Sequence, residues 1–394
     1  MTSTRRNLMR SGDVVEVTNV ELFFDLVYVF AITQLSHRLA THTSVESAVQ
    51  TAILLGLVWQ AWAYTTWVTN WVDPDRLPTR AMLLAVMLAS LLLSAGLPRA
   101  FADRGLLVAG AYAAIQIGRS VFAVFAVRGH RLQRNFERIL AWCVISGVAL
   151  IVGSRTHGHA REAIWLAAVA FDFLGGRVGF WTPVLGRSTT DEWTISGNHF
   201  AERCEAFVII ALGESVVAIG TTLSATARLT AAQVVTFVVA FAGTVGLWWV
   251  YFDRVAESGA RAITRAVDPG RLGSRAYHLV HPVIIGGIIA AAAGDNLMLA
   301  HPGRRGHWPV TLLLAGGFAL FLGGHGLFKA IAFHVVPWSR IAGIAVLALL
   351  VAVSPYLTAL ALGIGTVLAV AVVAVADRLQ HPVPAQADGR RDGP

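Results

Sequence analysis

Apolar runs of close to 20 residues recur along the whole chain, and they limit the fold more than any other feature. Of the 394 residues, 56% are hydrophobic and 14% are charged, whereas soluble domains carry about 25% charged residues. A run of about 18 or more apolar residues is long enough to cross the hydrocarbon core of a bilayer as a helix. The sequence therefore predicts an all-α polytopic membrane protein.

These runs predict twelve transmembrane helices. They cover residues 18–36, 49–70, 79–98, 106–127, 136–153, 163–182, 200–223, 231–252, 277–299, 308–330, 338–354 and 356–376. Glycine pairs such as Gly286-Gly287 and Gly316-Gly317 suit close helix contacts in lipid.

Short matching motifs indicate an internal repeat. Glu21-Leu-Phe23 opens the first span and Glu205-Ala-Phe207 opens the seventh, and two further pairs follow in the same order. An even number of spans in each unit predicts two parallel six-helix repeats, related by an axis along the membrane normal. The expected domains are an N-terminal tail (1–17), a first repeat (18–196), a second repeat (197–378) and a disordered tail (379–394).

Basic residues are concentrated in alternate loops. The richest loops cover residues 5–10, 76–80, 128–138, 254–275 and 378–391. Because basic loops stay in the cytoplasm, we expect both termini to be cytoplasmic. The net charge of +8 could also indicate nucleic acid, but the chain has no nucleic-acid-binding motif or long basic tract. The expected partners are therefore the lipid bilayer and a small ion or solute, and not nucleic acid.

Glu214 is the first candidate for a functional residue. At ~1.5 Å per residue it lies about 21 Å along the seventh span from Phe200. An ionisable side chain at that depth in a membrane is costly and usually functional. Glu205 is nine residues away, on the opposite helix face, so both carboxylates can face one cavity only if the helix unwinds near Gly213. Otherwise Glu205 contacts a neighbouring helix.

Other intramembrane acids form a second group of candidates. Glu21 and Asp25 share one face of the first span. They either line a hydrated path or are helix-end carboxylates satisfied by arginine or backbone amides. Asp172 lies near the middle of the sixth span with Arg177 after it, and the two form either a structural pair or part of a site.

Four more polar residues lie near predicted span ends. Glu202 and Arg203 are expected at the cytoplasmic mouth of the seventh span. Asp295 lies near the outer end of the ninth span and is a candidate for an extracellular-side entrance. His325, between two glycines, is more typical of a hydrogen-bonded structural histidine than of a ligand.

Catalytic and cofactor motifs are missing from the sequence. It contains no nucleotide-binding, kinase or Ser/His/Asp motif in a workable context. His278 and His281 share a helix face, but they lack the dense Cys/His pattern of a dedicated metal site. We therefore expect no cofactor, no metal and no assigned catalytic residue.

Three stretches resemble the bacterial low temperature requirement A family. They are ELFFDLVYVFAITQLSH within 20–38, FDFLGGRVGFWTPVLGRS within 171–189 and FAERCEAFVIIALGES within 199–216, with shorter matches at 247–255 and 294–303. The resemblance implies a multi-span protein of the bacterial inner membrane whose molecular activity is poorly defined. Where the family commonly has proline after the Asp172 motif, this chain has Gly175-Gly176.

The first span also resembles the Phe-Ser-Asp helix that lines the pore of potassium channels built from two six-helix repeats. In this chain Phe24 stands in place of the serine, and the seventh span has no such motif.

The sequence leaves three functional hypotheses. The first is a transporter or channel for a small ion or solute, in which Asp25, Asp172 and Glu214 gather near the seam between the repeats and Glu214 exchanges a proton. The second is a membrane-embedded enzyme for a lipid or hydrophobic metabolite, with Asp172, Glu202 and Glu214 as acid, base or cation-stabilising groups. The third is a non-catalytic scaffold whose acids pair with Arg119 and Arg177.

Overall fold

The computed structural model describes residues 8–10, 17–189, 197–225, 229–253 and 272–380. This part of the chain forms twelve long α-helices, and it has three isolated β-bridges and no strand. The first six helices are α1 (Asn19–Thr41), α2 (Val45–Trp71), α3 (Leu77–Gly96), α4 (Gly105–Ala126), α5 (Gln133–Gly153) and α6 (Gly158–Arg177). The next six are α7 (Gly197–Ser224), α8 (Ala231–Phe252), α11 (His281–Ala300), α12 (Trp308–Phe333), α13 (Trp338–Val353) and α14 (Ala359–Gln380).

Short helical turns join some of these helices. A 3-10 turn, η1 (Leu97–Arg99), follows α3, a π-helical turn, η3 (Gly273–His278), precedes α11, and a 3-10 turn, η4 (Ser354–Tyr356), follows α13. The predicted disordered tail lies outside the described residues from residue 381 onward.

Ten of the helices are long and apolar enough to cross a membrane, which confirms a protein with multiple membrane spans. The other two, α2 and α6, fill predicted spans but carry buried polar side chains such as Gln60 and Asp172. Most of α2 is buried by protein. A helix enclosed by other helices does not face lipid, so it need not be uniformly apolar.

The outer surface of the bundle is apolar. Large aliphatic side chains face outward, with Leu88, Val238, Leu349 and Leu368 each more than half exposed. Soluble monomers rarely expose continuous apolar patches of this kind. This surface suits the acyl chains of a bilayer.

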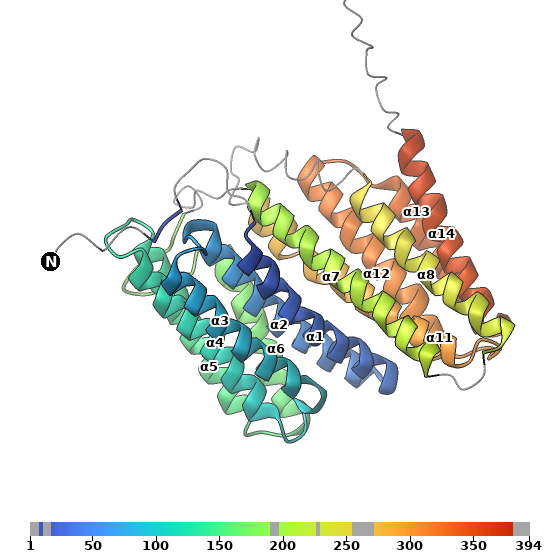
Figure 1. The fold of residues 1–394 in the computed structure, drawn as a ribbon, viewed down its shortest axis with the longest axis horizontal. Coiled ribbons are helices and arrows are strands. Elements are labelled where there is room, and N and C mark those ends of the chain that lie inside the picture. Colours follow the sequence, from blue (N-terminus) through green and yellow to red (C-terminus); the bar gives the residue numbers. More distant parts are fainter. Residues whose placement is uncertain (1–7, 11–16, 190–196, 226–228, 254–271, 381–394) are drawn as a thin grey trace, which may run out of the picture.

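The helices form two bundles that lie side by side (Figure 1). In the first bundle, α1 packs on α2 and α3. Each of the helices α3, α4 and α5 then packs on the next helix in the chain, and α6 packs on α2. In the second bundle, α7 packs on α8 and α11. Each of the helices α11, α12 and α13 then packs on the next helix in the chain, and α14 packs on α8. The helices of the two bundles therefore contact one another in the same sequence.

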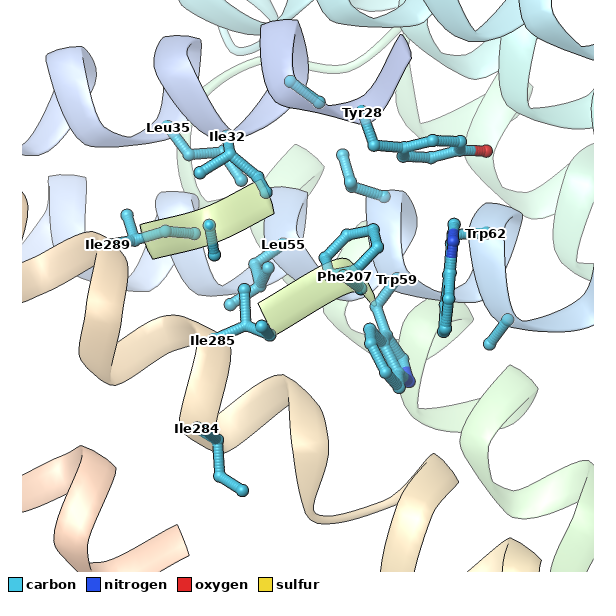
Figure 2. Close-up of a cluster of buried hydrophobic side chains, with 14 of the residues drawn as sticks. Tyr28, Ile32, Leu35, Leu55, Trp59, Trp62, Phe207, Ile284, Ile285 and Ile289 are labelled. Atoms are coloured by element: carbon cyan, nitrogen blue, oxygen red, sulfur yellow. The ribbon is translucent and has the colours of Figure 1, made fainter. Parts of the chain in front are cut away.

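The surface where the bundles meet, which we call the seam, is formed by α1 and α2 on one side and α7 and α11 on the other. Its centre is filled by packed apolar side chains (Figure 2), among them Ile32, Leu35, Phe207, Ile285 and Ile289. The seam is thus tightly packed along this stretch.

Two glycines let α11 and α12 touch backbone to backbone. A Cβ atom added to Gly317 would lie 2.5 Å from the amide nitrogen of Ala291, and one added to Gly287 would lie 2.5 Å from that of Phe321. Any side chain there would force the helices apart. The predicted role of glycine in close helix contacts is confirmed at these positions.

The N-terminal segment binds beside the start of α1. Arg10 donates its backbone N–H to Trp71 at the end of α2 (2.9 Å), and Asp73 donates to Leu8 (2.8 Å). These bonds bring the Arg10 side chain to α1. We call this end of the bundle, where α1 begins and α2 ends, the basic end, because Arg76, Arg80, Arg128, Arg131 and Arg187 follow or precede helices there.

Candidate functional site

A buried ion-pair cluster joins the beginning of α1 to the beginning of α7. Arg203 of α7 donates to Asp25 of α1 twice, from Nε to Oδ2 at 2.9 Å and from Nη2 to Oδ1 at 2.5 Å. Its Nη1 donates to Oε1 of Glu21 at 3.0 Å. A two-pronged contact of this kind is among the strongest that arginine makes with a carboxylate.

Further donors complete the cluster. Trp62 of α2 donates Nε1–H to Asp25 Oδ1 at 2.6 Å, and Arg10 donates to Glu21 Oε2 at 2.9 Å. The Nε2 atom of His199 lies 2.9 Å from Glu21 Oε1. Buried charges persist only when they are paired and hydrogen-bonded. The α1 acids therefore match the alternative in which arginine satisfies helix-end carboxylates, and the cluster acts as a joint between the bundles.

Glu214 has a different environment on the same seam. It lies about three turns beyond Arg203 on α7 and is 4% exposed. Its Oε2 accepts a 2.6 Å hydrogen bond from Thr33 Oγ1 of α1. Within the described residues, no basic nitrogen lies within 4.0 Å of its carboxylate. Glu214 is thus a buried seam carboxylate without the basic partners that Glu21 and Asp25 have.

The helix that carries these residues is continuous. α7 passes through Gly213 without unwinding. Glu205 is half-buried and lies within electrostatic range of Tyr251 on α8 and Tyr277 on η3. The continuous helix excludes the alternative in which α7 unwinds near Gly213. Glu202 is exposed at the start of α7, whereas its neighbour Arg203 points inward.

Asp172 of α6 points into the first bundle and not toward the seam. The hydroxyl of Tyr112 on α4 donates to its Oδ2 at 2.5 Å, and Gln116 donates to the same hydroxyl at 2.8 Å. Tyr64 of α2 donates to the backbone carbonyl of Asp172 at 3.0 Å. Arg177 is exposed at the end of α6. The structure therefore does not bring Asp172 to Arg177, or to the acids of α1 and α7.

A pocket of about 90 Å³ lies between the first bundle and the end of η3, near the basic end. Most of its wall is aromatic, with Tyr64, Trp67, Trp71, Phe136, Phe173 and Phe180 among the lining residues. The polar side chains in the lining are Arg119, Ser120, Ser188, Thr189 and His278, and no described lining residue is acidic.

The pocket wall includes the segment that follows α6. Gly179 adopts a φ of 64°, in the left-handed region, and the amide of Ser188 donates to its carbonyl at 2.8 Å. A Cβ atom on Gly179 would lie 2.3 Å from the Ser188 carbonyl oxygen. Only glycine therefore allows the chain after α6 to fold back at this position. The fold-back brings Ser188 and Thr189 to the pocket.

Sequence reasoning missed this pocket. From the sequence, Arg119 is expected only as a partner for acids, although a lone arginine inside the apolar run of α4 is a signal for a buried polar site. Tryptophans at the end of α2 were a second signal, but their link to α4 depends on the tertiary fold.

The remaining candidates lie in the second bundle. Asp295 of α11 is 4% exposed, and the side chain of Asn296 beside it accepts from Thr222 of α7 at 3.0 Å. His325 of α12 is fully buried, and its Nδ1 accepts from Nε of Arg340 at 3.2 Å. The hydrogen bond to Arg340 gives His325 a structural contact.

Candidate metal ligands do not cluster in the part of the chain that the structure describes, where no group of three or more His, Cys, Asp or Glu could hold an ion. His281 instead stacks on Tyr277 with ring centroids 4.8 Å apart, and its Nε2 lies 2.8 Å from the Tyr251 hydroxyl. His278 packs against Tyr64 and Phe173. Both histidines take part in aromatic packing.

The fold and its buried polar groups define a polytopic α-helical membrane protein made of two packed bundles. A profile of the family described as "Bacterial low temperature requirement A protein (LtrA)" matches residues 16–375. The chain belongs to this family, as its motifs predicted. It is also 36% identical over 369 residues to the uncharacterized protein RA0937 of Rhizobium meliloti (strain 1021), a match that covers 92% of this chain and 89% of that protein.

Proposed function

We propose that the protein transports a small ion or solute across the bacterial cytoplasmic membrane. The observation that carries this proposal is the carboxylate of Glu214, which is buried where the two bundles meet, accepts a hydrogen bond from Thr33 across the seam, and has no basic partner among the described residues. A buried acid without a basic partner can take up a proton or cation when its surroundings change. Movement of one bundle against the other would change those surroundings.

The bundle arrangement supports this proposal. The same order of helix contacts in α1–α6 and in α7, α8 and α11–α14 is what two parallel six-helix repeats would give. Many transporters consist of two such repeats, and their substrates pass between them. We accordingly assign residues 18–196 and 197–378 to the two repeats and the basic end to the cytoplasm.

The packing of the seam favours a transporter over a permanently open channel. Aliphatic and aromatic side chains, including Ile32, Phe207 and Ile289, fill the space between the bundles. A hydrated path along this stretch would require the bundles to separate. The packed arrangement therefore corresponds to a closed state.

The two rival functions have less support. A paired-carboxylate enzyme needs two acids at one pocket, and the described lining of the pocket includes none. A pure scaffold would give every buried acid a basic partner. Asp25 has one in Arg203, but Glu214 does not fit that description.

Flux measurements in proteoliposomes test the proposal. The purified protein would be reconstituted with a trapped pH dye, and proton, Na⁺ and K⁺ movement would be followed under imposed gradients. We expect flux above that of empty liposomes for the wild type. The variant Glu214→Gln keeps the shape and the Thr33 contact but cannot ionise, and we expect it to reduce the flux to background.

Glu202→Gln is the matched control, because Glu202 lies on the same helix but is exposed. Its flux should equal that of the wild type. If wild-type protein moves none of these ions and no added solute, or if Glu214→Gln moves them as well as the wild type does, the proposed role is wrong.

A further inference from the structure

We propose that the aromatic pocket around Arg119 binds a small organic anion, namely a carboxylate with a short apolar body. This inference goes beyond the transport proposal, because it assigns a ligand class to a site away from Glu214 and holds whether or not the ligand is transported. It depends on the charge, the walls and the size of the pocket.

The charge comes from Arg119, which is 1% exposed and lines the pocket. Its Nη2 atom contacts the Gln116 carbonyl at 3.4 Å, Ser120 Oγ at 3.1 Å and Cys143 Sγ at 3.8 Å. Among the residues that the structure describes, its Nε and Nη1 atoms are buried and have no hydrogen-bond partner. Within the described residues, no carboxylate oxygen lies within 4.0 Å of this guanidinium. A buried cation in this state is a strong anion-binding group.

Asp172 does not take the place of that anion. It is close enough to interact electrostatically with Arg119, but Tyr112 occupies its Oδ2 atom at 2.5 Å. The Arg119 guanidinium instead lies over the ring of Tyr64, with 5.2 Å between its Cζ atom and the ring centroid. This contact partly compensates the charge and leaves the unbonded nitrogens available.

Three other buried arginines of the chain have the hydrogen-bond partners expected of a purely structural arginine. Arg203 has two carboxylates. Arg161 donates to the carbonyls of four residues, Thr156, Ala100, Ala102 and Ser154. Arg138 donates from Nε and Nη2 to the Leu185 carbonyl and from Nη1 to Asn135. Arg119 departs from this pattern, because two of its three guanidinium nitrogens have no hydrogen-bond partner in the described part of the chain.

The walls indicate an apolar body. The rings of Tyr64, Trp67, Trp71, Phe136, Phe173 and Phe180 surround the space. An inorganic ion would leave these rings in contact with nothing, whereas an alkyl group would bury apolar area against them. The ligand therefore combines one anionic group with hydrocarbon.

The volume limits the length of that hydrocarbon. An apolar cavity of about 150 Å³ holds one benzene molecule. On that scale the pocket, at about 90 Å³, accepts a body of roughly three to four carbons. Butyrate has this size, and octanoate or a phospholipid does not.

Equilibrium binding to the full-length protein in nanodiscs tests the inference. Butyrate is the probe, followed by saturation-transfer NMR and calorimetry. Butyramide has the same shape without the charge, sulfate has the charge without the alkyl group, and octanoate is too long. We expect saturable butyrate binding and at least about tenfold weaker binding of the other three, as loss of a charged hydrogen bond implies for butyramide.

Two variants locate the site. Arg119→Met should weaken butyrate binding by about tenfold or more, and Arg119→Lys should restore part of it. Because Arg119 lacks structural partners at Nε and Nη1, Arg119→Met should also keep the thermal unfolding temperature of the wild type in the absence of ligand. A structural arginine would give the opposite result, a large loss of stability.

The inference is overturned if wild-type protein shows no saturable butyrate binding, if butyramide binds as well as butyrate, or if Arg119→Met binds butyrate normally. Should Arg119→Met fail to fold, the comparison of ligands on the wild type and on Arg119→Lys still decides. None of these results depends on ion flux, so the outcome is separate from that of the transport proposal.

Discussion

Arg203 holds Asp25 through two hydrogen bonds, at 2.5 and 2.9 Å, although the residues lie 178 positions apart and on different bundles. Both side chains are withdrawn from solvent. The contact therefore fixes the relative position of α1 and α7 at one end of the seam.

Removing one member of this pair should be costly. Asp25→Asn removes the carboxylate charge that pairs with the buried Arg203. We therefore expect a loss of about 3–5 kcal/mol in the free energy of unfolding. Thermal or denaturant unfolding in detergent micelles measures it. The double variant Asp25→Asn with Arg203→Met should recover part of the loss. The exposed pair of Arg378 with Asp253 is the control, and Arg378→Met should leave stability unchanged. Equal effects at both sites would contradict the assigned role.

Trp62 contributes to the same joint through its indole N–H. Trp62→Phe keeps a ring near Phe207, whose centroid lies 4.6 Å away, but removes the donor to Asp25. We expect a loss of about 1–3 kcal/mol, as for a hydrogen bond to a charged group. Trp181→Phe, at a residue that is 56% exposed, should have little effect in the same unfolding assay. A neutral Trp62→Phe would mean that the indole contact adds no stability.

Adjacent glycines on α12 provide a matched test of helix packing. Gly317→Ala places a Cβ atom 2.5 Å from the Ala291 nitrogen, whereas Gly316→Ala meets nothing within 4 Å. We expect Gly317→Ala to lower the free energy of unfolding by about 1–3 kcal/mol through overpacking. Gly316→Ala should be neutral or slightly stabilising. The reverse order of stability would show that α11 and α12 do not touch at this position.

Cysteine labelling tests the proposed orientation. Both native cysteines, Cys143 and Cys204, are buried and free, so the wild type should resist a membrane-impermeant maleimide. Arg128→Cys and Arg155→Cys place thiols at exposed positions on opposite ends of the bundle. In intact cells we expect labelling of Arg155→Cys alone, and in inside-out vesicles of Arg128→Cys alone. The opposite pattern would invert the assigned topology.

Sequence patterning predicted the helices well because hydrophobic length is a local property. The predicted span 231–252 has the same bounds as α8, and the predicted span 308–330 ends three residues before α12 does. The helix-end alternative for Glu21 and Asp25 also follows from their position in the first turns of α1.

The partners of these residues could not be predicted in the same way. Periodicity places Asp25 on a helix face, but it does not say that Arg203 or Trp62 lies opposite that face. Asp172 shows the same limit, since its partner Tyr112 comes from α4 while the nearest candidate in the sequence was Arg177. The pocket around Arg119 depends on several helices at once, and no local pattern predicts such a combination.

The polar contacts between the two bundles differ in number and charge along the seam. Near the start of α7 it has several short charged contacts, and about 16 Å farther on, at ~1.5 Å per residue, Glu214 has one hydroxyl. Separating the bundles at the start of α7 would expose buried ions or leave them without partners. Separating them at Glu214 would break one hydrogen bond and some aliphatic contacts. In the transporter proposed above, a rocking motion should thus pivot on the ion-pair cluster around Arg203 and separate the helices at the other end of the seam, so that the transported species would enter from that end.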